Sequence, residues 1–240
     1  MRPPTSARHR PFARGVGRES AGAPGFTLIE LLTVLAVVGI LSAVVLPSLT
    51  GARAAAARAR TRVQFAQWAM AVAAFRDEYG VLPVFDPSDK VNGGAAAAAN
   101  GPHPFFDVLA GRRRDGSALP LTGPDGSPET QNTRHLAFIE FGANDLFSPS
   151  AESPAQNLLH DAFENTDIAV LMDKSGDGLV SELDYPVRPS VSPPDDPGVR
   201  LVPSDADFPL GAGGGVRAAV LFYCAPPHAR TASDLILSWR

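Results

Sequence analysis

An almost unbroken apolar run near the amino terminus, from Phe26 to Leu49, constrains this chain more than any other feature. About 20 apolar residues at a helical rise of ~1.5 Å match a hydrocarbon core ~30 Å thick. The run therefore predicts a single membrane-spanning helix over residues 26–49. One acid, Glu30, interrupts it. Because an acid inside a bilayer costs roughly 2.5–3.5 kcal/mol unless it has a partner, Glu30 is a candidate functional residue.

Charge is distributed unevenly about this run. Residues 1–25 hold five arginines and one glutamate, a net charge of +4, so the remainder carries −8 within a chain of net charge −4. Basic residues that flank a span stay on the cytoplasmic side. We therefore expect a cytoplasmic amino terminus and an extracytoplasmic head. No basic patch indicates a nucleic-acid partner, and the single cysteine, Cys224, excludes an internal disulfide and is predicted to be a buried strand residue.

The segment Gly25-Phe26-Thr27-Leu28-Ile29-Glu30-Leu31-Leu32 resembles the class III signal of type IV pilins and type II secretion pseudopilins. A secretory signal would place its cleavage site after the apolar region, whereas here a single glycine precedes it. In that family, a prepilin peptidase cuts after the glycine and methylates the new amino terminus. The resemblance implies cleavage between Gly25 and Phe26, N-methylation of Phe26 and removal of a leader, residues 1–25. Pro47 lies where the family has a helix-kinking proline.

The resemblance also gives Glu30 a partner. If Phe26 becomes an amino terminus, its ammonium group on a neighbouring subunit can pair with the carboxylate, and a low-dielectric assembly strengthens that attraction. Glu30 is therefore an assembly residue under this interpretation. The alternative is a plain membrane anchor whose acid lies close enough to the cytosolic end to reach water.

The helix is expected to continue beyond the membrane over residues 50–80. This stretch is rich in alanine and lacks proline. Its large apolar residues are spaced three and four apart, so they form one stripe that predicts packing on a globular layer; they are Phe65, Trp68, Val72, Phe75 and Tyr79. Gly80 and Pro83 are expected to end the helix. The Tyr79–Pro83 ending resembles the major pseudopilin subgroup.

Residues 81–240 are predicted to form a loop-rich head. A short helix is expected at residues 105–109, and residues 134–147 are expected to form either a short strand or a helical turn. Three strands are predicted at residues 167–172, 216–223 and 234–239. The proline-rich stretch 186–209 is predicted to be an irregular surface segment. The fold class is therefore α+β: a long N-terminal helix on a small antiparallel sheet with long loops.

Residues 173–184 have the spacing of a calcium-binding EF-hand loop. Oxygen donors occupy the required positions, with Gly178 sixth for the sharp turn; the predicted ligands are Asp173, Ser175, Asp177, the Leu179 carbonyl, Ser181 and Asp184. The twelfth residue is Asp184 where glutamate is usual, and flanking helices are not expected. A tight turn without an ion explains the Asp, Ser and Gly residues equally well.

These observations predict a structural protein and not an enzyme, since no histidine or serine stands in a catalytic arrangement. The expected role is a subunit inserted in the inner membrane, with a periplasmic head, that joins a type II secretion pseudopilus. Its partners would be identical or related pilin subunits, the prepilin peptidase and the inner-membrane assembly platform. The alternatives are a type IV pilus subunit or minor pilin and, from another class, a membrane-tethered calcium-dependent binding module.

Overall fold

The computed structural model describes residues 26–93, 102–120, 130–147, 157–209 and 214–240, with the backbone alone at 44–50 and 143. The chain divides into two compact units, Met1–Leu49 and Thr50–Arg240. The second unit contains the head.

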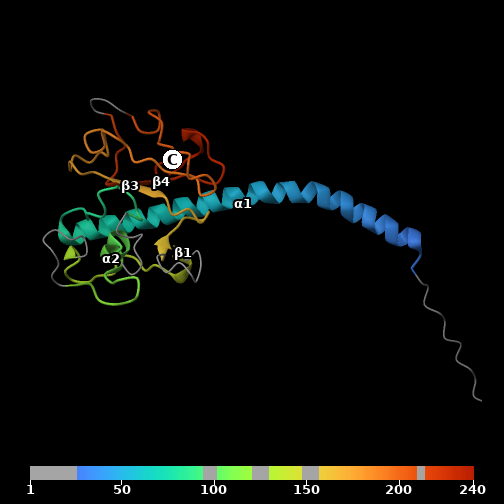
Figure 1. Cartoon of the computed structure of the whole chain (residues 1–240), viewed down its shortest axis with the longest axis horizontal. Helices are drawn as coiled ribbons and strands as arrows, with labels where there is room; N and C mark the ends of the chain where they lie inside the picture. The colour runs from blue at the N-terminus through green and yellow to red at the C-terminus, as the bar shows by residue number, and fades with distance from the viewer. Residues whose placement is uncertain (1–25, 94–101, 121–129, 148–156, 210–213) are drawn as a thin grey trace, which may run out of the picture. The chain divides into compact units, whose positions relative to one another are not determined.

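One long helix, α1, runs from Leu28 to Tyr79 (Figure 1). Gly80 ends it in the left-handed conformation, at φ 74°, and its N–H donates to the carbonyl of Arg76 at 2.7 Å. A residue without Cβ adopts this closing conformation without steric cost. The end predicted from Gly80 and Pro83 is therefore confirmed.

A three-stranded antiparallel sheet forms the centre of the head, in the order β3-β4-β5. Its strands are β3 (Ile168–Met172), β4 (Val220–Cys224) and β5 (Ile236–Leu237). The predicted first strand is confirmed, but the second begins four residues later than expected and the third is shorter. Val216 instead pairs with Val180 in an isolated bridge, and Asp234 belongs to the 3-10 helix Ala232–Asp234.

Both faces of this sheet are buried, which explains why every residue of β3 and β4 is buried. Alternate strand residues point to opposite faces. Ile168, Val170 and Phe222 join the core formed with α1, where Phe65, Trp68, Val72 and Phe75 are at most 2% exposed. The predicted apolar stripe is therefore the helix face that packs on the sheet.

The opposite face of the sheet has its own core, which the sequence analysis did not foresee. Ala169, Leu171 and Tyr223 pack there against residues of the 180–208 segment, the orange stretch of Figure 1. Its buried members include Val180, Tyr185, Val191, Leu201 and Phe208. The description of 186–209 as a surface segment is thus wrong: prolines make its path irregular, but its apolar side chains cover a sheet face.

Smaller elements complete the head. The expected short helix is α2 (Pro104–Ala110). Residues 134–147, expected to form either a short strand or a helical turn, end in the 3-10 helix Ala143–Asp145 followed by β1 (Leu146–Phe147). β1 pairs antiparallel with β2 (Leu158–Leu159), which was not predicted. The Ala95–Ala99 run lies outside the described residues.

Candidate functional site

The surface of α1 near its amino terminus is apolar on every side. The large apolar side chains of this part of α1, and that of Phe26 just before it, are between 52% and 80% exposed; they are Phe26, Leu28, Ile29, Leu31, Leu32, Val34, Leu35, Val37, Val38, Ile40 and Leu41. A contiguous apolar surface of this kind marks an interaction site. Among the residues described with side chains, no helix is long and apolar enough to cross a membrane.

Glu30 takes part in a capping box at the start of α1. The N–H and the hydroxyl of Thr27 donate to Glu30 Oε2, at 2.8 and 2.7 Å, and the Glu30 N–H lies 3.3 Å from Thr27 Oγ1. Each residue thus satisfies a donor that the helix leaves without a partner. Within the described part of the chain, no hydrogen bond reaches Oε1, so this oxygen can accept a donor from another molecule.

Thr27 is not among the predicted site residues. The pattern Thr-x-x-Glu before an apolar run is a recognised capping signal and could have identified it. Phe26, the predicted new amino terminus, is 79% exposed immediately before the helix. Gly25 lies outside the described residues. The backbone is helical through Pro47, and its side chain also lies outside the description.

The 173–184 loop is closed by its own carboxylates. Asp173 accepts hydrogen bonds from the N–H groups of Gly176, Asp177 and Gly178, at 2.7, 3.2 and 2.8 Å. The carboxylate of Asp184 accepts from Ser175 N at 2.8 Å and from Ser181 N at 3.0 Å. These bonds fix the turn, with Gly176 and Gly178 at positive φ.

Two other predicted ligands lie close to these carboxylates, with Ser175 Oγ 3.2 Å from Asp173 Oδ1 and Ser181 Oγ 3.5 Å from Asp184 Oδ2, but Asp177 does not join them. Asp177 Oδ1 instead accepts from the N–H of Leu179 at 2.8 Å. Across the described residues, no group of three or more His, Cys, Asp or Glu side chains is arranged to hold a metal ion. The calcium site therefore stays a prediction, and the loop is not a hairpin, since β3 pairs with the distant β4.

Lys174 is the one cation of this loop. Its ammonium group lies 2.8 Å from Asp89 Oδ1 and 4.2 Å from the centre of the Tyr185 ring. Four acids and one lysine give residues 173–184 a formal charge of −3. Lys174 therefore pairs with an acid outside the loop.

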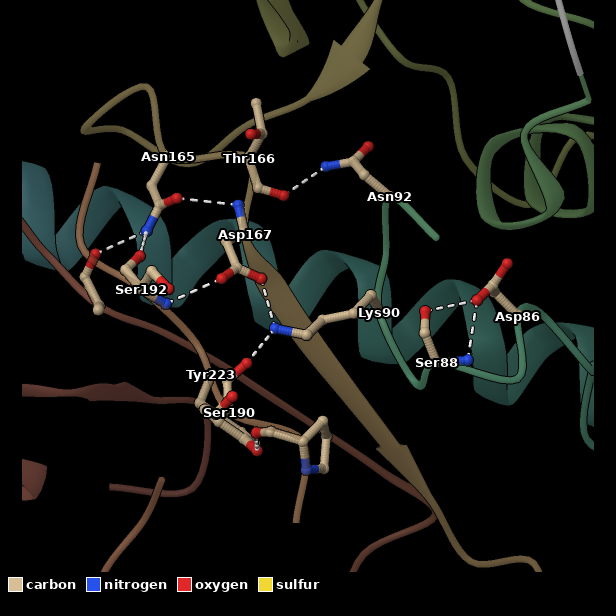
Figure 2. A network of polar contacts seen from close by, with 12 residues as sticks. Asp86, Ser88, Lys90, Asn92, Asn165, Thr166, Asp167, Ser190, Ser192 and Tyr223 are labelled. Atoms are coloured by element: carbon tan, nitrogen blue, oxygen red, sulfur yellow. Dashed lines mark hydrogen bonds and ion pairs between the residues drawn. The ribbon is translucent and has the colours of Figure 1, made fainter. Parts of the chain in front are cut away.

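Lys90, the residue after Asp89, belongs to a second polar network, which Figure 2 shows. The ammonium group of Lys90 bonds to the carboxylate of Asp167 and to the carbonyl of Ser190. The other oxygen of Asp167 accepts from Ser192 N at 2.8 Å. Burial lowers the pKa of Lys90, and the Asp167 carboxylate opposes that shift. The network attaches the proline-rich segment to β3, so we assign it a structural role.

The fold and the helix start define a mixed α+β protein with an N-terminal helix packed on small antiparallel sheets. The family model of the prokaryotic N-terminal methylation motif matches residues 23–46, which include Gly25, Phe26 and Glu30. The chain therefore carries a type IV pilin-like prepilin signal. Comparison with curated proteins and with solved structures found no match.

Proposed function

We propose that this chain is a prepilin that is assembled into the periplasmic pseudopilus of a type II secretion system. Prepilin peptidase cleaves it after Gly25 and methylates Phe26. Residues 26–49 hold it in the inner membrane, with the head in the periplasm, until the assembly platform adds it to a filament of related subunits. The observation that carries this proposal is the methylation motif at 23–46, which coincides with the exposed apolar surface of α1.

The contacts of the single chain support an assembly role for that surface. Both cores of the head are built from residues beyond the apolar segment, so the head buries its own apolar side chains. The side chains from Phe26 to Leu41 remain exposed. Lipid covers them before assembly, and close packing against other helices covers them in the filament.

A type IV pilus subunit or a minor pilin is the neighbouring alternative. The same motif serves these proteins, so the head must decide between them. Neighbouring genes for a secretion ATPase and an outer-membrane secretin would favour the pseudopilus.

The first test is cleavage. Coexpression with a prepilin peptidase should shorten the chain by the 25 leader residues and leave N-methylated Phe26, as N-terminal sequencing and mass spectrometry would show. Gly25→Leu should block cleavage because a bulky residue replaces the one without a side chain. Gly39→Leu, a matched change within the helix with no atom within 4 Å of the added Cβ, should leave cleavage intact. An uncut wild-type chain would refute the proposal.

We also propose that residues 173–184 bind calcium. The loop already orders two carboxylates about Ser175 and carries a formal charge of −3. Binding requires Asp177 to turn from the Leu179 N–H toward these carboxylates. Bound calcium would supply the missing positive charge and link the two ends of the loop.

The calcium proposal predicts a higher melting temperature for the full chain in neutral detergent. Calcium at 100 times its Kd stabilises a site by about 2.7 kcal/mol, which is a rise of about 5–10 °C for a chain of this size. Asp177→Ala should remove the rise, while Asp77→Ala, at an exposed acid on α1, should keep it. An equal melting temperature with and without calcium in the wild type would leave the loop as a turn alone.

A further inference from the structure

Four arginines lie in the ten-residue stretch 53–62, which follows the apolar segment of α1. Neither the methylation motif nor the head core accounts for three of them. Arg58 is half-buried and donates to the carbonyl of Asp234 at 3.2 Å, so it belongs to the head. Arg53, Arg60 and Arg62 are exposed and form no ion pair with any described residue. We call these three side chains the arginine collar.

The collar residues point to more than one side of the helix. At about 100° per residue, Arg53 and Arg60 lie on one side and Arg62 lies on nearly the opposite side. A protein partner contacts one side of a helix, as the sheet does along the Phe65 stripe. Lipid headgroups surround a helix that leaves a membrane. The distribution of the collar therefore favours lipid.

The distances along the helix also agree with a headgroup layer. Arg53 lies four residues beyond Leu49, about 6 Å at 1.5 Å per residue, and a headgroup layer is roughly 5–7 Å thick. Arg60 and Arg62 lie about 10–13 Å beyond that layer. This is more than a Debye length of ~8 Å, but a long arginine side chain that reaches back toward the interface brings its guanidinium group within that range.

We infer that Arg53, Arg60 and Arg62 bind the phosphate groups of anionic phospholipids in the leaflet that faces the head. The inference rests on the membrane placement proposed above. Guanidinium groups match phosphate oxygens in bidentate geometry. Cleavage after Gly25 removes the five leader arginines, so the collar becomes the main basic flank of the span. It then holds the processed subunit at the membrane surface until assembly withdraws it.

The alternative partner is an acidic group of protein, either in the head of the same chain or on a second copy. Arg60 lines a cavity of about 540 Å³ together with Asp145, whose carboxylate accepts a hydrogen bond from Gly142 N at 2.7 Å. This carboxylate already has a donor, and it lies on one side of the helix only. It therefore does not account for Arg53 and Arg62.

Lipid selection by the full chain tests the collar. The protein is purified in a neutral detergent and offered equal amounts of phosphatidylglycerol and phosphatidylcholine, and native mass spectrometry measures the bound ratio. A basic residue near an anionic surface contributes about a fivefold preference. We expect phosphatidylglycerol to be preferred at least tenfold. R53Q/R60Q/R62Q should bring the ratio close to one, and R76Q/R200Q/R217Q, which removes the same charge from the head surface, should keep the preference.

Two results would overturn the proposed binding of lipid by the arginine collar. One is an unchanged lipid preference in R53Q/R60Q/R62Q with helical content equal to the wild type. This result overturns the lipid role even if the variant also loses chemical crosslinks between copies, a loss that would indicate a protein partner. The other is an equal loss of lipid preference in R76Q/R200Q/R217Q, which would show that the preference depends on the total charge of the chain and not on the collar. Carbonate extraction of cell membranes tests the proposed membrane placement separately: an extracted chain contradicts that placement without changing the lipid preference measured in detergent.

Discussion

The imidazole of His103 caps α2 from a fully buried position. Its Nδ1 accepts the Phe106 N–H at 3.2 Å, so the proton resides on Nε2, which lies 2.9 Å from Asn92 Oδ1. Both ring nitrogens are satisfied only in the neutral form. Burial, with a smaller contribution from the positive charge of Arg114, lowers the pKa of His103 to about 3.

This pKa makes the stability of the head depend on pH. Below about pH 6.5 the unfolded chain binds a proton at His103 that the folded chain does not bind, so stability falls with falling pH until about pH 3. The slope is at most about 1.4 kcal/mol per pH unit. Between pH 6.5 and 5.5 the loss is about 1 kcal/mol, so the melting temperature should fall by about 2–4 °C.

Replacement of the imidazole isolates this effect. His103→Asn keeps a capping oxygen for Phe106 N without a titrating group, so its melting temperature should change much less across the same interval. His228→Asn, at an exposed position of positive φ that asparagine tolerates, should retain the wild-type slope. An equal slope in the wild type and in His103→Asn would show that other groups cause the loss.

At the scale of elements, Trp68 joins the long helix to the rest of the first core. Its ring centre lies 5.7 Å from that of Phe65, 5.2 Å from Phe105 of α2 and 5.6 Å from Phe222 of β4. Such aromatic pairs add stability beyond the area that they bury. The side chain therefore couples one helix to another and to the sheet.

Trp68→Ala should be among the most destabilising single changes in the head. Loss of a buried tryptophan costs about 3–5 kcal/mol, which lowers the melting temperature of a chain of this size by roughly 6–20 °C. Met70→Ala, two residues along the same helix at a 64% exposed position, should change it by little. Near-ultraviolet circular dichroism of the full chain in detergent measures both. Equal effects would show that the Trp68 cluster does not limit stability.

The elements that the sequence predicts are those with local signals. The spacing from Phe65 to Tyr79 and the glycine at 80 predict the helix face and its end, and apolar runs predict β3 and most of β4. The β1–β2 pair was missed because each strand has two residues and the pairing joins separate segments. The second core was missed because Val191 and Phe208 are scattered between prolines.

The features of the candidate site were also predictable only where the sequence carries a local signal. The segment from Gly25 to Leu32 has a local pattern that the methylation-motif match supports. The spacing of the 173–184 donors predicted a shared ion, but spacing does not determine where each carboxylate points. Asp177 bonds to Leu179 N, a choice that depends on the backbone conformation of the turn.

For the whole molecule, the contacts of α1 suggest that Glu30 serves two states of the chain. In the single subunit, Oε2 accepts both donors of Thr27. In a filament, the ammonium group of a neighbouring Phe26 can bind Oε1 without breaking this cap. A glutamine at position 30 can still cap the helix, but it lacks the charge that attracts the ammonium group.

Glu30→Gln should therefore separate processing from assembly. We expect prepilin peptidase to cleave this variant after Gly25 at the wild-type rate, because the leader, Phe26 and the capped helix are retained. Filament yield in cells that produce the secretion machinery should fall at least tenfold, since one lost charge pair in a low-dielectric assembly is worth more than 1.4 kcal/mol. Glu140→Gln, an exposed acid of the head, should assemble normally. Wild-type filament yield from Glu30→Gln would show that the charge is dispensable, and an uncut variant would place Glu30 in recognition by the peptidase instead.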